Sequence, residues 1–457
     1  LSRALLRRTV RWTAARLAPP YWTVDGRRER TRVQALLRTA PSGGTPRPAG
    51  RLKVAFVIPW YGKGIGGGAE AECWGLVHGL RRYCPAVEVE VLTTTLQEFS
   101  ADWNRPVHPE GVREEDGVTV HRFHPTTPDR RFFHVLNGAC LMRGDTATLK
   151  TRGCRSPVSQ AAEYFYLKHM IQSPGLWQFL IERYNDYDFF VYMPYMFAPA
   201  VIGGQLTRRK SLVIPCLHDE RTAFMGIYKG LMTSVRAGLY HVRSEMELAR
   251  TIYGERLTRS FLLGEQVDVN PPAGNADRFR ARFGVRDPFL LFAGRKVEGK
   301  NLPLLVQYFR AYKRLHPGPL KLVLVGRGSL SFPDEPDVID LGFVSGEEKY
   351  DAYAAAAAFC LPSLFESFSI VIMEAWLQKT PVLIHRGCEV TRDHVTDSGG
   401  GLMFADEAEF VEAVHRLVTR PKEARAMAER GLEYVRSHYA PEIILKRFES
   451  ILRELAG

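Results

Sequence analysis

The chain has 457 residues, of which 45% are hydrophobic and 25% charged, and its formal net charge is +12. This length suggests two or three domains, and the composition is that of an ordinary globular protein. No apolar run reaches the roughly 18 to 20 residues that span a bilayer, and arginines interrupt the first 20 residues too often to predict a signal peptide.

Much of the positive charge lies in residues 1–50, which hold eleven arginines and two acidic residues. The last part of this segment, residues 39–50, is rich in Pro, Gly and Ser and predicts a linker. We expect a basic N-terminal arm that either lies on an anionic membrane surface or is simply solvated, since Arg8 and Arg16 flank its apolar face. No nucleic-acid recognition motif accompanies the charge, so nucleic acid is not an expected partner.

The seven cysteines are scattered and never form a C-x-x-C pair. An odd number without paired spacing predicts neither a disulfide framework nor a zinc site, and it is typical of a reducing compartment. We therefore expect a cytoplasmic protein, which a lipid-binding arm would hold at the inner face of the plasma membrane.

From residue 51 onward, short apolar runs alternate with amphipathic stretches, which predicts alternating strands and helices. We expect strands at residues 53–60, 87–93, 118–123, 189–193 and 212–217, and helices at residues 69–83 and 160–184. Residues 241–254 predict the end of a strand, a cap at Ser244 and a helix. Residues 125–160 show no clear periodicity and predict an irregular insertion.

Pro, Gly and Asn interrupt the pattern at residues 264–287 and place a domain boundary near residue 270. Alternation then restarts, with strands expected at residues 288–293, 321–325, 358–361 and 381–384, and helices at residues 302–315, 347–358, 367–378, 407–418, 421–437 and 441–455. Two such series predict two doubly wound sheets, in residues 51–270 and 271–440, with the last helix (441–457) packing back on the first domain. Ligands of these sheets bind outside the carboxyl ends of the strands, so we expect the site in a cleft between the domains.

Two glutamates, Glu366 and Glu374, stand eight residues apart after an expected strand. If a helix opens at Ser367, the amides of Ser367, Phe368 and Ser369 are unpaired donors at the positive end of its dipole, which suits a phosphate. Carboxylates accept two hydroxyl hydrogen bonds, which suits a ribose diol or a sugar. The alternative is a helix cap and a surface glutamate.

Arg295 and Lys300 lie in one loop directly after the strand expected at residues 288–293. Two cations there can neutralise a departing diphosphate, on which negative charge grows as a glycosidic bond breaks. The alternative is a pair of solvated loop charges.

Three motifs resemble those of glycosyltransferase family four: G-R-x(4)-K-N at residues 294–301, V-G-R-G at 325–328, and E-x(7)-E at 366–374. The segments GGAEAEC, VLTTT and PCLHDE of the first domain resemble a bacterial surface-polysaccharide subgroup of that family. The resemblance covers residues 52–455. It implies an α/β protein of the GT-B type, with two Rossmann-like domains facing a central cleft, that retains anomeric configuration and needs no metal or other cofactor.

The resemblance also implies roles for individual residues. Arg295 and Lys300 hold the donor diphosphate, Glu374 binds the ribose and Glu366 contacts the donor sugar. Ser367 and Ser369 stand where relatives have the glycines of Glu-Gly-Phe-Gly. The further residues implied to line the donor site are Gly294, Gly326, Phe343 and Val344, the last two facing the base, and the glycine loop Gly66, Gly67 and Gly68 near the donor phosphates.

Two residue patterns of the first domain need separate interpretation. Gly62, Gly64 and Gly67 fit G-x-G-x-x-G, but an NAD site needs an acidic residue where the next strand ends, and that strand ends in threonines. Many relatives place a histidine in the segment that here reads VYMPYMFAP, which contains none. His218, after the next strand, is therefore our choice for the polar group beside the transferred sugar, although a lone histidine is more often structural.

The motifs together predict a retaining glycosyltransferase that moves a hexose from a nucleotide diphosphate sugar to a saccharide or polyprenyl-linked saccharide acceptor. The expected setting is the synthesis of a bacterial surface polysaccharide such as O-antigen. Two alternatives stay open: a non-catalytic domain that binds sugar nucleotides or acts as a scaffold within a larger polymerase, and a GT-B epimerase or phosphorylase. Intact Arg295, Lys300, Glu366 and Glu374 favour the transferase.

Overall fold

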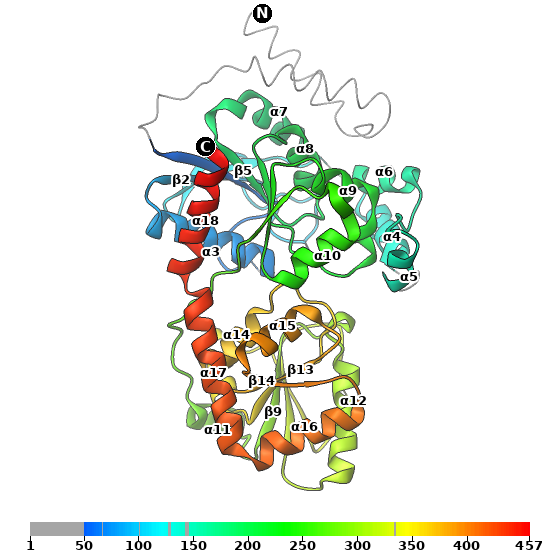
Figure 1. Ribbon diagram of the computed structural model, residues 1–457, viewed down its shortest axis with the longest axis vertical. Helices are drawn as coiled ribbons and strands as arrows, with labels where there is room; N and C mark the ends of the chain where they lie inside the picture. The colour runs from blue at the N-terminus through cyan, green and yellow to red at the C-terminus, as the bar shows by residue number, and fades with distance from the viewer. Residues whose placement is uncertain (1–49, 66, 100, 127–128, 142–145, 333–334) are drawn as a thin grey trace, which may run out of the picture. The chain divides into compact units, whose positions relative to one another are not determined.

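The structure is a computed structural model that describes residues 50–457 except 66, 100, 127–128, 142–145 and 333–334 (Figure 1). It divides into two compact units. Unit 1 comprises the described residues up to His241, Glu245–Gly264 and Leu445–Gly457, and unit 2 comprises Val242–Ser244 and Glu265–Ile444. The expected basic arm lies outside the described residues.

Unit 1 is built on a sheet of eight strands among its described residues, in the order β3-β4-β2-β1-β5-β6-β7-β8. The strands are β1 (Leu52–Val57), β2 (Val87–Thr94), β3 (Gly111–Glu115), β4 (Val118–Phe123), β5 (Phe189–Tyr192), β6 (Ser211–Val213), β7 (Ala237–Tyr240) and β8 (Arg259–Leu262). All neighbours pair in parallel except β3 and β4. The strands β5, β6 and β7 are buried along their whole length, as expected for parallel strands covered on both faces.

The α-helices between β1 and β8 correct two expectations. These helices are α3 (Gly68–Tyr83), α4 (Arg130–Leu141), α5 (Thr146–Thr151), α6 (Gln160–Lys168), α7 (Pro174–Glu182), α8 (Gly204–Leu206), α9 (Gly226–Met232) and α10 (Arg243–Tyr253). The irregular insertion expected at residues 125–160 is wrong, because it contains α4 and α5. The single helix expected at residues 160–184 is two helices, because Pro174 lacks an N–H and begins a new helix at its first position.

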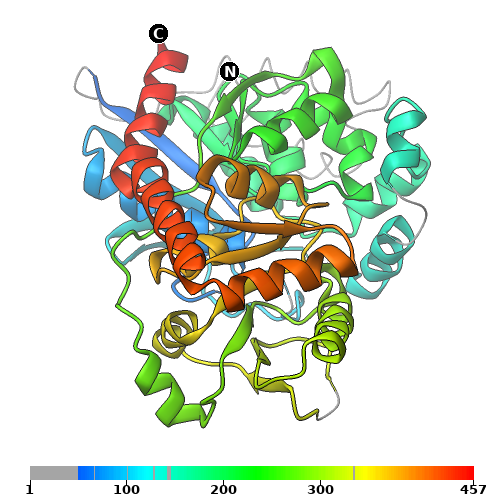
Figure 2. The same cartoon turned by 60° about the horizontal axis from the view of Figure 1, so that its bottom comes forward.

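Unit 2 has an all-parallel sheet of six strands among its described residues, in the order β11-β10-β9-β12-β13-β14. Its strands are β9 (Phe289–Ala293), β10 (Lys321–Val325), β11 (Val338–Gly342), β12 (Ala358–Leu361), β13 (Val382–His385) and β14 (Gly401–Phe404). Its helices are α11 (Ala276–Phe283), α12 (Leu302–Leu315), α13 (Gly346–Ala355), α14 (Ile370–Leu377), α15 (Glu389–Ser398), α16 (Glu407–Thr419) and α17 (Pro421–Tyr439). Figure 2 shows α16 and α17, in orange-red, beside the β13 and β14 side of this sheet.

The last helix, α18 (Pro441–Ala456), carries the chain back into unit 1 from Leu445 onward. There Phe448 meets Phe56 of β1 edge to face, with ring centroids 6.1 Å apart. The guanidinium of Arg447 donates a hydrogen bond of 2.7 Å to the carbonyl of Leu263. These contacts anchor the end of the chain on the sheet of unit 1.

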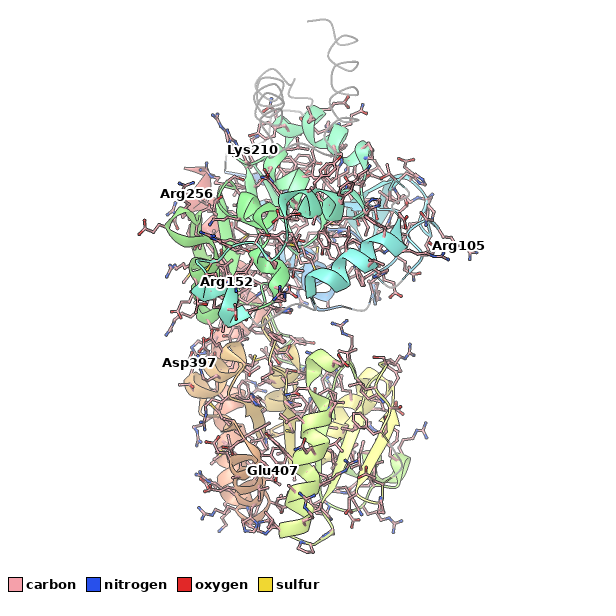
Figure 3. The ribbon with its side chains drawn as sticks, turned by 90° about the vertical axis from the view of Figure 1, so that its right-hand side faces the viewer. Arg105, Arg152, Lys210, Arg256, Asp397 and Glu407 are labelled. Carbon is pink, nitrogen blue, oxygen red and sulfur yellow. The ribbon has the colours of Figure 1, made fainter. Side chains whose placement is uncertain are left out.

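Charged side chains such as Arg105, Arg152 and Arg256 lie on the outside of unit 1 (Figure 3).

The side chains of six cysteines are described by the structure, and none of these six forms a disulfide. None of the described helices has both the length and the apolar character that crossing a bilayer requires.

Candidate functional site

The strand order of unit 2 reverses between β9 and β12, and the predicted donor residues follow these two strands. Open parallel sheets bind ligands at such a switch point, outside the carboxyl ends of the strands. Lys300 follows β9, Glu366 follows β12, and the Lys300 Nζ lies 2.5 Å from Glu366 Oε1. Side chains predicted separately from two motifs therefore meet at the expected corner of the sheet.

Arg295 lies in the same loop as Lys300, but its guanidinium is exposed. Among the described residues of unit 2, the Arg295 guanidinium makes no hydrogen bond or ion pair. Its neighbour Lys296, which the sequence analysis did not single out, is buried, and its Nζ lies 2.6 and 2.7 Å from the two carboxylate oxygens of Asp340. Asp340 also accepts a 2.9 Å hydrogen bond from the amide of Gly342, so this pair joins the loop after β9 to the end of β11.

The glycines of the first two motifs allow the loops after β9 and β10 to lie against each other. A Cβ on Gly326, whose φ is +132°, would lie 1.9 Å from the carbonyl oxygen of Gly294. The amide of Gly294 donates to Val325 at 3.0 Å, and the amide of Gly326 donates to Gly342 at 2.7 Å. The absence of a side chain at Gly326 therefore lets the backbone after β10 pack directly against Gly294.

The expected helix start at Ser367 is wrong, because α14 begins at Ile370. Ser369 precedes it in the left-handed conformation, with φ +73°, which a helix cannot continue. The amides of Ser367, Phe368 and Ser369 therefore belong to a loop and do not form the first turn of the helix. Phe368 is buried, and its carbonyl lies 3.0 Å from His394 Nε2.

Two hydroxyl groups near this corner are buried without a hydrogen-bond partner among the described residues. They are the Oγ atoms of Ser363, which follows β12, and Ser369, which precedes α14. A buried hydroxyl left unpaired is costly, and donors of this kind are suited to the oxygens of a bound anion. Ser369 was predicted from its amide, and the structure adds its side chain.

Glu374, the predicted ribose ligand, lies on α14 and contacts two residues of α13. Its Oε1 lies 2.6 Å from the Lys349 Nζ, and its Oε2 accepts a 3.2 Å hydrogen bond from the Tyr353 hydroxyl. Burial, together with the charge of Glu374, raises the pKa of Tyr353 well above its ordinary value, so this hydroxyl keeps its proton as a donor. The sequence analysis missed these two partners of Glu374. Their spacing of four residues was the available signal, because it puts Lys349 and Tyr353 on one face of a helix.

The two residues expected to face the base differ in exposure. Phe343 is 64% exposed, and the guanidinium carbon of Arg327 lies 4.1 Å from the centroid of its ring. Val344 is buried. Phe343 and Arg327 thus form an exposed flat surface at the end of β11, whereas Val344 packs inside the unit.

The remaining predicted residues belong to unit 1. Gly68 begins α3. Gly67 has φ +151°, and a Cβ added to it would lie 1.9 Å from a carboxylate oxygen of Glu70. Gly66 lies outside the described residues. His218 follows β6 and is half-buried, and its imidazole has no hydrogen bond to the described part of unit 1. Its neighbour Asp219 lies 2.7 Å from the Lys150 Nζ.

Comparison with known proteins gives this geometry its context. Residues 287–420 match the family described as glycosyl transferases group 1. An N-acetylgalactosaminyltransferase of Campylobacter jejuni that acts on a diphospho-undecaprenol-linked saccharide, by its name, is 36% identical over 132 residues, which are 27% of this chain and 32% of that protein. The MMP alpha-(1->4)-mannosyltransferase of Mycolicibacterium hassiacum is 28% identical over 245 residues, 51% of this chain and 59% of that protein. The matches span between 32% and 63% of the length of the curated relatives.

Solved structures extend the likeness to both units. Sucrose-phosphate synthase of Thermosynechococcus elongatus superposes with a TM-score of 0.62 at 16% identity, covering 89% of this chain and 99% of that one. HepE of Anabaena in complex with UDP-glucose superposes with a TM-score of 0.58 at 14% identity, covering 88% of this chain and 100% of that one. These likenesses show the GT-B fold. With the match at residues 287–420, they make the chain similar to glycosyltransferases of the family four type in its second unit and to GT-B proteins in its fold.

Proposed function

We propose that this protein is a retaining glycosyltransferase that transfers a hexose from a nucleotide diphosphate sugar to a saccharide or polyprenyl-linked saccharide acceptor. The observation that carries the proposal is the pairing of Lys300 with Glu366 at the switch point of unit 2. A cation and a carboxylate that are held together but partly open to solvent can each exchange their partner for a ligand. A diphosphate would take the lysine, and sugar hydroxyls would take the glutamate.

The leaving diphosphate would be stabilised by charge and by hydrogen-bond donors. Lys300 and the exposed Arg295 supply two positive charges after β9, where negative charge grows as the glycosidic bond breaks. The buried hydroxyls of Ser363 and Ser369 supply donors from the loop after β12. Lys349 and Tyr353 hold the Glu374 carboxylate in place, and this carboxylate would accept hydrogen bonds from the ribose hydroxyls.

The acceptor hydroxyl would attack from the face that the diphosphate leaves, and the leaving phosphate oxygen would take its proton. This route needs neither a protein base nor a metal, in accord with the family resemblance. His218 is the residue of unit 1 that we assign to the transferred sugar.

The names of the relatives support the acceptor class. The Campylobacter jejuni relative is named for an undecaprenol-linked acceptor, and a relative from Rhizobium meliloti is named for lipopolysaccharide core biosynthesis. We therefore propose a role in bacterial surface-polysaccharide synthesis, at the cytoplasmic face of the membrane, with residues 1–50 as the segment that meets anionic lipid.

A thermal-shift panel of GDP-, UDP-, dTDP- and ADP-sugars tests the donor site. One donor should stabilise the full chain, and Lys300→Ala and Glu374→Ala should each abolish the shift. Lys422→Ala, an exposed lysine of α17, is the matched control and should keep it. A full shift in both site variants would show that the donor binds elsewhere.

Turnover of that donor separates an enzyme from a scaffold that only binds it. Release of the nucleoside diphosphate, measured with and without acceptor, should depend on Lys300. It should continue after a short exposure to EDTA. Loss of turnover in EDTA that manganese restores would argue for a metal-dependent reaction.

A further inference from the structure

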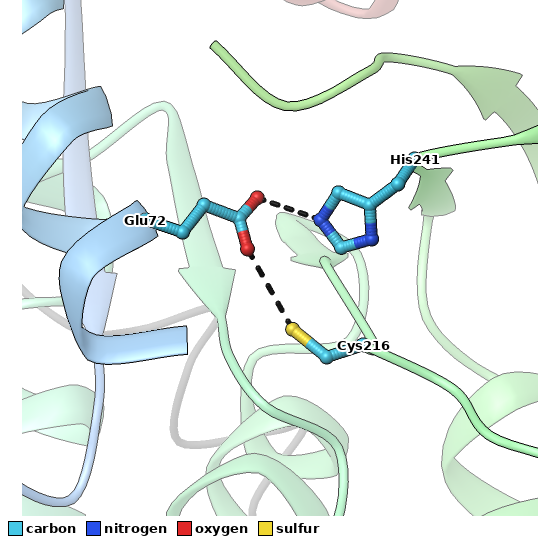
Figure 4. A group of neighbouring side chains, drawn as sticks. All are labelled: Glu72, Cys216 and His241. Carbon is cyan, nitrogen blue, oxygen red and sulfur yellow. Dashed lines mark hydrogen bonds and ion pairs between the residues drawn. The ribbon is translucent and has the colours of Figure 1, made fainter. Parts of the chain in front are cut away.

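A group of metal-binding side chain types lies inside unit 1, apart from the residues discussed so far. Glu72 comes from α3, Cys216 from the segment after β6, and His241 from the end of β7 (Figure 4). Glu72 Oε1 lies 2.7 Å from His241 Nε2, and Glu72 Oε2 lies 3.7 Å from Cys216 Sγ. The ligand atoms of all three residues lie within 4.8 Å of one another.

The charged members of this group are almost completely removed from solvent. The side chains of Glu72 and His241 are 2% and 1% exposed, and that of Glu245 on α10 is 0% exposed. Charges at such depth are expensive unless they are paired or coordinate a metal. The carboxylates of Glu72 and Glu245 lie on either side of the His241 imidazole, so the site strongly favours a positive charge.

Glu245 fixes the orientation of the imidazole. Its Oε2 lies 3.1 Å from His241 Nδ1, and its two oxygens also accept hydrogen bonds from the amides of Leu217 and His241, at 2.7 and 2.6 Å. This ion-pair contact lacks hydrogen-bond geometry, and Nε2 on the other side of the ring points to Glu72 (Figure 4). In metal-binding histidines the second ring nitrogen usually faces a carboxylate that sets the tautomer.

We propose that Glu72, Cys216 and His241 bind one divalent cation of the zinc class, with Glu245 as the residue that orients His241. The two oxygens of Glu72, the thiolate and Nε2 provide four ligand atoms, and a set of sulfur, nitrogen and oxygen suits zinc or cobalt better than magnesium or calcium. Bonds of about 2.0 to 2.3 Å place two ligand atoms roughly 3.3 Å apart. The imidazole and the Glu72 carboxylate would therefore separate by about half an ångström to admit the ion.

The ion would join three elements that are distant in sequence. It would tie α3, which begins next to the glycine loop, to the ends of β6 and β7.

The spacing of the ligands explains why the sequence did not reveal this site. Zinc sites are usually recognised from cysteines and histidines a few residues apart. Here the ligands are at positions 72, 216 and 241, and only the folding of the sheet brings them together. The expectation of no zinc site, drawn from cysteine spacing, does not address such an arrangement.

Metal analysis and cobalt substitution of the purified full chain test the proposal. We expect one equivalent of zinc per chain, or one equivalent of added Co²⁺ that gives a thiolate-to-cobalt charge-transfer absorption. Cys216→Ser should remove that absorption, and Cys73→Ser, a buried cysteine next to Glu72 on α3, should keep it. Glu245→Gln should keep the absorption but weaken cobalt binding about 10- to 100-fold.

The wild-type measurement is decisive even if a variant does not fold. No stoichiometric zinc and no thiolate–cobalt absorption would overturn the site. Absorption that persists in Cys216→Ser would assign the metal elsewhere. These readouts do not involve a sugar nucleotide, so they stand or fall independently of the proposed transfer reaction.

Discussion

The two units use the strand ends of similar parallel sheets in opposite ways. In unit 1, Glu72, His241 and Glu245 form a network that is at most 2% exposed. In unit 2, the pair at the switch point is more open, with 21% of the Lys300 side chain and 9% of the Glu366 side chain exposed. Breaking a buried network is costly, whereas a partly solvated pair contributes little to stability. Charge at the strand ends is therefore enclosed within unit 1, whereas in unit 2 it is open to a ligand that arrives from solvent.

The largest effect on stability should come from His241. His241→Ala removes the side chain that contacts two buried carboxylates, and we expect a loss of about 3 to 5 kcal/mol in the free energy of unfolding. Urea denaturation of the two proteins measures it. Lys300→Ala, which removes a partly solvated charge, is the contrasting variant and should cost less than about 1 kcal/mol. Equal losses in the two variants would erase the difference between the units.

Activity should show the reverse order. Lys300→Ala removes a charge that stabilises the leaving diphosphate, and we expect kcat to fall about 10²- to 10³-fold. Steady-state release of the nucleoside diphosphate measures this change, with Lys422→Ala as the control for the loss of a lysine from unit 2. A loss of less than threefold would mean that Lys300 does not meet the diphosphate.

Residues that are close in sequence could be predicted well, and those that depend on distant partners could not. Lys300 and Glu366 sit in local motifs at strand ends, and their side chains meet because parallel sheets bring strand ends to one edge. The partners of Glu374 could not be identified, because the packing of α13 against α14 selects Lys349 and Tyr353. The helix start at Ser367 was wrong because the sequence contains no glycine to signal the left-handed residue, and Ser369 adopts that conformation instead.

The fold followed the same rule. Buried apolar runs such as β10 and β12 were predicted within a residue, since their pattern is complete in the local sequence. The exposed edge strand β3 and the short strand β14 were missed, because pairing with a neighbour defines them more than their own composition does. Contact between Lys296 and Asp340 likewise joins segments that are 44 residues apart.

That contact gives an intermediate test of how unit 2 holds its ligand loops. Lys296→Met keeps the apolar stem but leaves Asp340 without its charged partner, and we expect a loss of about 2 kcal/mol in stability. Because Asp340 also fixes the amide of Gly342, next to Phe343, donor affinity should fall as well. Asp340→Asn should add little to Lys296→Met if the pair acts as a unit. Arg416→Met, which breaks a solvated ion pair, should change neither property.

The smallest effect concerns the backbone between the two predicted glutamates. Ser369 holds φ at +73°, a conformation that costs a residue with a Cβ about 1 to 2 kcal/mol and costs glycine nothing. Ser369→Gly removes this cost and also the unpaired buried hydroxyl, but it adds entropy to the unfolded chain. We expect a net gain of about 0.5 to 1 kcal/mol in urea denaturation. Ser367→Gly, two residues earlier, is the matched control. Ser367 has no positive φ, so this variant should lose stability instead.

If the Ser369 hydroxyl binds the donor phosphates, the stabilised Ser369→Gly protein should bind the donor more weakly than the wild type. Stronger or equal binding would assign the phosphate contacts at this corner to the backbone and to Lys300.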